Sequence, residues 1–200
     1  MNRKDNFNFT KIASWADTVD LLAHDPRYSE FFSNSYLASE IVDSWKAYCE
    51  SSEWKAIEKI ITSTLSNVPG SIAMDMPCGN GIGTYALTKL GFDVMAVDPE
   101  RSSHVGTGAV DENLEVLQTK VKTHNCFGEK LPFADNYFDF VFVRQGLHHA
   151  DDLNVMCGEL YRVLKPGGLL IAAREHVVNN YTSGLKEFLM SQPDHRLYGG

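Results

Sequence analysis

An apolar run that leads straight into a glycine-rich turn limits the folds open to this chain. Residues 71–87 read SIAMDMPCGNGIGTYAL. Four more short apolar runs follow, namely DVMAVD, KTHNCF, FDFVFV and GLLIAAR, and helical patterns separate most of them. Runs of this kind suit strands that are buried on both faces. Alternation of strands with helices therefore predicts a doubly wound, mostly parallel α/β sheet with flanking helices.

The segment before this sheet has a different pattern. Residues 43–65 read DSWKAYCESSEWKAIEKIITSTL, in which large apolar side chains recur at helical spacing, so we expect two or three helices here. The sequence Asn-Val-Pro-Gly at 67–70 breaks the pattern. We predict a helical cap over residues 1–66 and a sheet-bearing domain over residues 67–200.

Two further helices follow from periodicity and caps. Apolar residues from Leu153 to Leu164 mark one helical face; Asp151 or Asp152 could cap its start, and the Pro-Gly-Gly at 166–168 is expected to stop it. A short helix is expected near residues 111–120. Irregular chain is expected before it, because Gly106 and Gly108 weaken a helix.

Composition argues against several classes of partner. The net charge is −8 and no cluster of Lys and Arg is present, which disfavours nucleic acid. The N-terminus lacks the apolar core of a secretory signal, and no apolar run reaches the roughly 18 residues of a membrane span. The four cysteines are widely spaced and predict neither a disulfide framework nor a metal site. A cytoplasmic protein is the expectation.

The glycine-rich turn is placed to hold a ligand, because open α/β sheets bind ligands beyond the carboxyl ends of their strands. Gly79 and Gly81 have no Cβ, so a ligand can approach the backbone. Asp98 follows the next predicted strand and could accept hydrogen bonds from a ribose. A plain connecting turn is the alternative. The sixth position of the dinucleotide fingerprint is Thr84 here, which disfavours NAD.

Several ordered motifs carry a resemblance to a known family. DMPCGNG, VMAVDPE, EKLPFADNYFDFVFVRQGLHHADD and ELYRVLKPGGLLIAARE, from about residue 70 to 176, resemble the class I S-adenosylmethionine-dependent methyltransferases. The likeness is to the broad group of quinone and small-molecule methyltransferases. It implies a Rossmann-like sheet of usually seven strands, S-adenosylmethionine as cofactor and a small-molecule methyl acceptor. No sixth or seventh strand is found in the sequence, although residues 184–191 could form a helix.

The resemblance also implies roles for individual residues. Asp75, Gly79 and Gly81 would line the methionine part of the cofactor, and Asp98 would hold the ribose. Pro77 stands where the family carries glycine; an extended strand end needs no positive φ, so we expect a usable cofactor site. The remaining cofactor contacts implied are Gly128 and Glu129 beside the adenine, where Phe127 replaces a frequent acid, and Arg144 and Gln145 near the methionine end.

Methyl transfer is an in-line displacement, so the main task of the enzyme is to align the acceptor with the methyl group. A base is needed only if the acceptor must lose a proton. His148 and His149 are the candidates, with a purely structural pair as the alternative. Arg174, Glu175 and His176 could contact a polar acceptor. The run after the fourth strand does not resemble that of enzymes that methylate amino groups of DNA bases.

The aromatic residues of the helical segment allow two interpretations: core packing, or a lid over the active site as in related enzymes. They are Tyr28, Phe31, Phe32, Tyr36, Trp45, Tyr48 and Trp54. Two functions stay open for the chain, an active methyltransferase or a non-catalytic domain that binds S-adenosylmethionine, with an NAD-dependent oxidoreductase as a weaker third. An uncovered fifth strand invites pairing with a second chain, which would give a homodimer.

Overall fold

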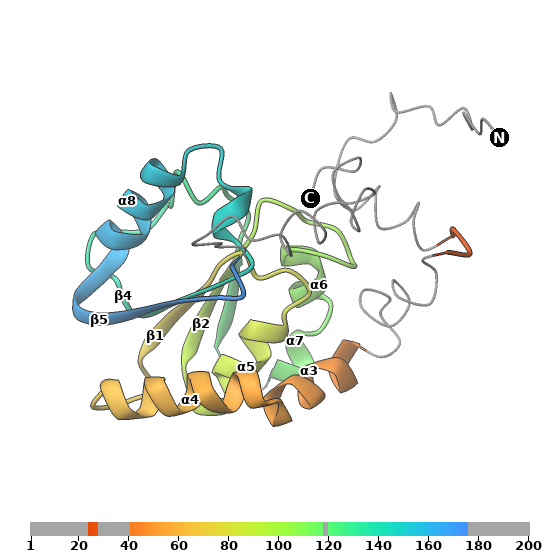
Figure 1. Ribbon diagram of the computed structural model, residues 1–200, viewed down its shortest axis with the longest axis horizontal. Helices are drawn as coiled ribbons and strands as arrows, with labels where there is room; N and C mark the ends of the chain where they lie inside the picture. Colours follow the sequence, from red (N-terminus) through yellow and green to blue (C-terminus); the bar gives the residue numbers. More distant parts are fainter. Residues whose placement is uncertain (1–23, 28–40, 118–119, 176–200) are drawn as a thin grey trace, which may run out of the picture.

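A computed structural model describes residues 24–27, 41–117 and 120–175 (Figure 1). Its elements, in chain order, are α3 (Ile41–Glu50), α4 (Ser52–Thr64), β1 (Ile72–Asp75), α5 (Ile82–Leu90), β2 (Asp93–Val97), α6 (Thr107–Asp111), α7 (Leu114–Leu117), β3 (Val121–His124), β4 (Phe138–Arg144), the 3₁₀ turn η3 (Leu147–His149), α8 (Leu153–Val163) and β5 (Leu164–Ala173).

The five strands form one sheet in the order β3-β2-β1-β4-β5, and every neighbouring pair is parallel. This confirms the predicted doubly wound sheet. Within the described ranges no sixth or seventh strand follows β5. The helix expected at 184–191 lies outside the described residues.

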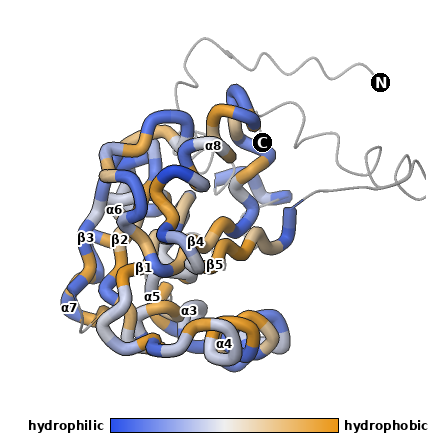
Figure 2. The backbone as a smooth tube through the Cα atoms, turned by 90° about the vertical axis from the view of Figure 1, so that its left-hand side faces the viewer, coloured by the Kyte–Doolittle hydropathy of each residue, from blue (hydrophilic) through white to orange (hydrophobic). Residues whose placement is uncertain are grey.

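Alternate residues of each strand point to opposite faces, and each face has its own helices. Phe140 and Phe142 of β4 face one core cluster, to which α4 contributes Ile57 and Ile61. Val141 and Val143 face the other, to which α8 contributes its buried side chains. Figure 2 shows α3 and α4 along one side of the sheet, with α8 away from them. The central strands β1, β2 and β4 are therefore buried on both faces, as their apolar runs predict, whereas the edge strands β3 and β5 are partly exposed.

The expected irregular chain before residue 111 is partly wrong, because α6 occupies 107–111. Gly106 caps α6 with φ of 84°, and a Cβ added at Gly108 would lie 2.4 Å from the carbonyl oxygen of Ser102. Both glycines permit a close approach of backbone instead of preventing a helix. The short helix expected at 111–120 is present as α7.

The end of α8 also differs from expectation. Asp152 caps its start, as one of the two expected residues, and its carboxylate accepts hydrogen bonds from Asn154 N and Val155 N at 2.9 and 3.2 Å. The helix ends at Val163, before the Pro-Gly-Gly that was expected to stop it. That sequence instead lies within β5, where the pairing shifts between Phe138 and Phe140 of β4.

The helices α3 and α4 confirm two of the two or three helices expected in the N-terminal segment. Trp45, Tyr48 and Trp54 are buried in core clusters shared with the sheet domain, which supports core packing for these three. The other aromatic residues of the lid hypothesis, at 28, 31, 32 and 36, lie outside the described residues. The division at residue 66 stays a prediction.

Candidate active site at the carboxyl edge of the sheet

The loop after β1 lies where the strand order reverses. Strands β2 and β3 extend to one side of β1, and β4 and β5 extend to the other. A crevice at such a switch point is where open α/β sheets bind ligands. We name residues 76–81 the glycine loop. It ends at Gly81, the cap residue of α5, whose φ of 90° suits glycine.

Gly79 is the point at which the glycine loop faces open space. A Cβ added there would meet no atom within 4 Å. Its amide donates a hydrogen bond to Asp98 Oδ2 at 2.9 Å, and its carbonyl oxygen accepts one from Gly106 N at 2.7 Å. The loop is thus tied to the end of β2 and to the start of α6, while its outer side stays accessible.

Asp98 is almost fully buried beside Gly79, with 4% of its surface exposed. Its Oδ1 accepts a hydrogen bond from Glu100 N at 2.9 Å. Burial raises the pKa of Asp98 to about 6, although the amides of Glu100 and Gly79 oppose the shift. Each carboxylate oxygen keeps a second lone pair. The residue can therefore hold the glycine loop and still accept from a ligand hydroxyl.

Asp75 is the other buried carboxyl group of the site, and it faces α5. Thr84 Oγ1 donates to its Oδ2 at 2.7 Å, and a Cβ added at Gly83 would lie 2.7 Å from its Oδ1. Burial raises its pKa to about 7, against the hydrogen bonds from Thr84, which lower it. The predicted contact of Asp75 with the methionine part of the cofactor stays a prediction, since α5 supplies its described neighbours.

The raised pKa of Asp75 predicts a pH dependence of stability. Its pKa rises from 3.8 to about 7 on folding, so between these pH values the folded protein holds a proton that the unfolded chain has released. The contribution of Asp75 to the free energy of unfolding should therefore fall as pH rises from about 4 to about 7, by at most about 1.4 kcal/mol per pH unit. Asp98, whose pKa is also raised, adds a decline of the same sign up to about pH 6. Asp75→Asn should flatten this decline in urea unfolding measured at several pH values. Parallel curves for the two proteins would contradict the assignment.

Pro77 follows a cis peptide bond and packs against the loop after β4. A Cβ added at Gly146 would lie 2.2 Å from Pro77 Cδ. Gly81 likewise permits a close contact, but its partner is Trp45 of α3, whose Cζ2 lies 2.8 Å from the position of an added Cβ. The structure thus places a protein side chain against Gly81, where the sequence suggested room for a ligand.

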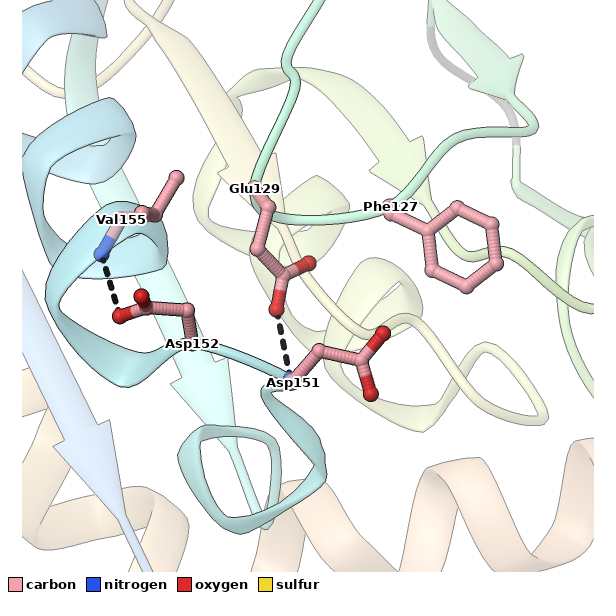
Figure 3. Close-up of a pocket in the computed structure, with 5 residues that line it drawn as sticks. All are labelled: Phe127, Glu129, Asp151, Asp152 and Val155. Atoms are coloured by element: carbon pink, nitrogen blue, oxygen red, sulfur yellow. Dashed lines mark hydrogen bonds between the residues drawn. The ribbon is translucent and has the colours of Figure 1, made fainter.

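Gly128 and Glu129, predicted to lie beside the adenine, are held by packing and by one hydrogen bond. A Cβ added at Gly128 would lie 2.6 Å from Met76 Cε. Glu129 accepts a hydrogen bond from Asp151 N at 2.8 Å. An open pocket of about 350 Å³ lies here (Figure 3). It is lined by Phe127, Glu129, Asp151, Asp152 and Val155.

Arg144, at the end of β4, is held by the N-terminal helices. Its Nε donates to Glu53 Oε1 at 2.7 Å, and its guanidinium lies 5.0 Å from the ring centre of Tyr48. Gln145 follows with φ of 54°, an uncommon value for a residue other than glycine. Sequence reasoning missed Glu53, for which no local motif gives a signal.

The two candidate bases lie in η3, just beyond β4. His148 Nδ1 is 3.2 Å from Glu175 Oε2, and the rings of His148 and His149 are centred 4.1 Å apart. Burial would raise the pKa of Glu175, but hydrogen bonds from Gly146 N, Leu147 N and His148 outweigh it and hold the pKa below its usual value. An ionised carboxylate thus orients His148, which is the arrangement that a histidine base needs.

Among the described residues, no group of three or more His, Cys, Asp or Glu side chains could hold a metal ion. No helix in the same part of the chain is long and apolar enough to cross a membrane. His176, offered above for acceptor contact, lies outside the described ranges.

Comparison with known proteins identifies a family domain in the sheet-bearing part of the chain. The model of a family described as "Methyltransferase domain" matches residues 74–172. Sterol 24-C-methyltransferase from Schizosaccharomyces pombe is 32% identical over 120 residues, which are 58% of this chain and 31% of that protein. Demethylmenaquinone methyltransferase from Staphylococcus aureus is 37% identical over 108 residues, 51% of this chain and 42% of that protein. The chain therefore spans less than half the length of these relatives.

Solved structures agree on the fold. A protein described as a candidate S-adenosyl-L-methionine-dependent methyltransferase from Methanococcus maripaludis superposes with a TM-score of 0.56 at 23% identity, over 80% of this chain and 71% of that chain. A S-adenosylmethionine-dependent methyltransferase from Mesorhizobium loti gives 0.50 at 20% identity, over 62% and 54%. By its motifs and its match to the family model, the part of the chain at residues 74–172 is a methyltransferase domain, and its sheet has the fold of the class I S-adenosylmethionine-dependent methyltransferases.

Proposed function

We propose that this chain transfers a methyl group from S-adenosylmethionine to a small-molecule acceptor. One observation carries the proposal: the open side of Gly79, tied to the buried Asp98, lies at the switch point of a methyltransferase-domain sheet. A backbone open at this point lets a ligand approach closely, and a carboxylate beside it suits a ribose.

The residues present fit this cofactor. Asp98 would hold the ribose, and Gly79 would lie against the methionine part, with Asp75, Pro77 and Gly81 shaping the glycine loop around it. Gly128 and Glu129 would lie beside the adenine, near the pocket that Glu129 helps to line. Arg144 and Gln145 would lie near the methionine end.

When bound, the cofactor supplies a methyl group on a positively charged sulfur, which is already a good leaving group. The chain must then align the acceptor with that methyl group, and alignment can lower a barrier by roughly 7–11 kcal/mol. His148, oriented by Glu175, would take a proton from an acceptor that loses one. His149 is the second candidate for that role.

The acceptor class is inferred from the relatives. Two of them are named for a sterol and for demethylmenaquinone, both largely apolar molecules, so we infer an apolar small-molecule acceptor. The net charge of −8 disfavours binding to nucleic acid, so we propose no nucleic-acid partner. A cytoplasmic location is part of this proposal. So is a homodimer, since β5 is an edge strand of the described sheet, with Leu170 38% exposed.

Calorimetric titration with S-adenosylhomocysteine tests the cofactor. We expect binding in the micromolar range, about −8 kcal/mol, and none for NAD as the control. A folded chain that binds NAD instead, or neither molecule, would contradict the proposal. Turnover of sterol or quinone acceptors then separates an enzyme from a non-catalytic binding domain.

A further inference from the structure

An aromatic side chain of the N-terminal helices packs against the glycine loop and donates a hydrogen bond to it. Trp45 of α3 is fully buried, and its indole Nε1 donates a hydrogen bond to the carbonyl oxygen of Asn80 at 3.1 Å. The same ring lies against Gly81, where an added Cβ would be 2.8 Å from Trp45 Cζ2. It also stacks on Tyr85 of α5, with ring centres 5.5 Å apart.

These contacts complete a set of three anchors on two consecutive loop residues. The amide of Gly79 is held by Asp98, and its carbonyl oxygen by Gly106 N. The next carbonyl oxygen, that of Asn80, is held by Trp45. The three partners come from the end of β2, from the start of α6 and from α3. Residues far apart in sequence therefore determine the position of the loop.

The geometry points to Trp45 as a positioning residue for the cofactor loop. We infer that its indole N–H, through Asn80, holds the glycine loop in the conformation that binds the cofactor; this rests on the function proposed above. The physical reason is pre-organisation: a loop that is competent only part of the time binds with an apparent affinity reduced by that fraction. Trp45 would touch no cofactor atom and would act only through the loop.

The chain offers a matched control. Trp54 of α4 is also buried, at 2% exposure, and it packs edge-on against Phe142 with ring centres 6.3 Å apart. Trp45→Phe and Trp54→Phe remove the same atoms from buried sites, so both should lower the melting temperature. Only the first removes a hydrogen bond to the glycine loop.

The test measures affinity and local protection in the full chain. We expect Trp45→Phe to weaken binding of S-adenosylhomocysteine about fivefold or more, as for a loop that is competent one fifth of the time. Trp54→Phe should leave the affinity within about twofold. Hydrogen exchange of the amides of residues 78–82 should accelerate in Trp45→Phe and stay unchanged in Trp54→Phe.

Each outcome decides one question. Equal affinities and equal exchange in the two variants would overturn the inference and leave the proposed function standing. Failure of the unaltered protein to bind S-adenosylhomocysteine would overturn the proposed function. In that case the exchange of residues 78–82 still decides whether Trp45 positions the loop.

Discussion

Asp98→Ala is expected to weaken binding of S-adenosylhomocysteine 10- to 100-fold at pH 8. The substitution removes the carboxylate that would accept from the ribose, and it also leaves Gly79 N and Glu100 N without their acceptor. Hydrogen bonds to a charged group contribute about 1.5–3 kcal/mol, which converts to that range of affinity. Calorimetry at pH 8 is appropriate because the pKa of Asp98 is raised to about 6, so the carboxylate is ionised there.

Asp93→Ala is the control on the same strand. Asp93 begins β2, at the opposite end from Asp98, and its carboxylate lies 3.9 Å from the exposed Lys120 Nζ. Such an exposed pair contributes little, so affinity should not change. If both variants bound as the unaltered protein does, Asp98 would not be the ribose contact. If both lost binding equally, the effect would be one of folding.

Gly83→Ala should destabilise the folded chain by about 1–3 kcal/mol, although alanine is the better helix former. The new methyl group would lie 2.7 Å from Asp75 Oδ1, inside van der Waals contact. To make room, the carboxyl group must move away from Thr84 Oγ1, with which it shares a buried hydrogen bond of 2.7 Å. Urea unfolding monitored by circular dichroism measures the change.

Gly158→Ala makes the same change in the middle of α8. A Cβ there meets no atom within 4 Å, so the variant should gain about 0.4–1 kcal/mol of stability. The two glycines thus give opposite signs for one chemical change. A stabilising Gly83→Ala would mean that the carboxyl group of Asp75 is not packed against the first turn of α5.

The sheet could be predicted because its signal is local. Apolar runs and the helices between them depend on short-range periodicity, and Asp152 caps α8 through amides two and three residues away. The glycine loop could be located for the same reason. A glycine-rich turn directly after a strand is visible without knowledge of any distant residue.

The partners of the glycines could not be predicted. Trp45 lies against Gly81, Pro77 lies against Gly146, and each pair joins segments that only the fold brings together. A sequence indicates that a position needs glycine; it does not say which side chain fills the space. For the same reason the sequence does not predict α6. Gly106 and Gly108 have low helix propensity, but in the fold they allow backbone to approach backbone.

The strand order also sets when this protein can acquire its site during synthesis. The central strand β1 pairs with β4, and the amide of Ile72 donates a hydrogen bond to the carboxylate of Asp139, 67 residues later. The glycine loop and Asp98 are synthesised before β4, the strand that pairs with β1 and completes the centre of the sheet beneath them. Pairings between residues so far apart in sequence form slowly, and until they form the unpaired apolar strands can associate with other chains. Competence to bind a ligand should thus be gained only after β4 has emerged from the ribosome.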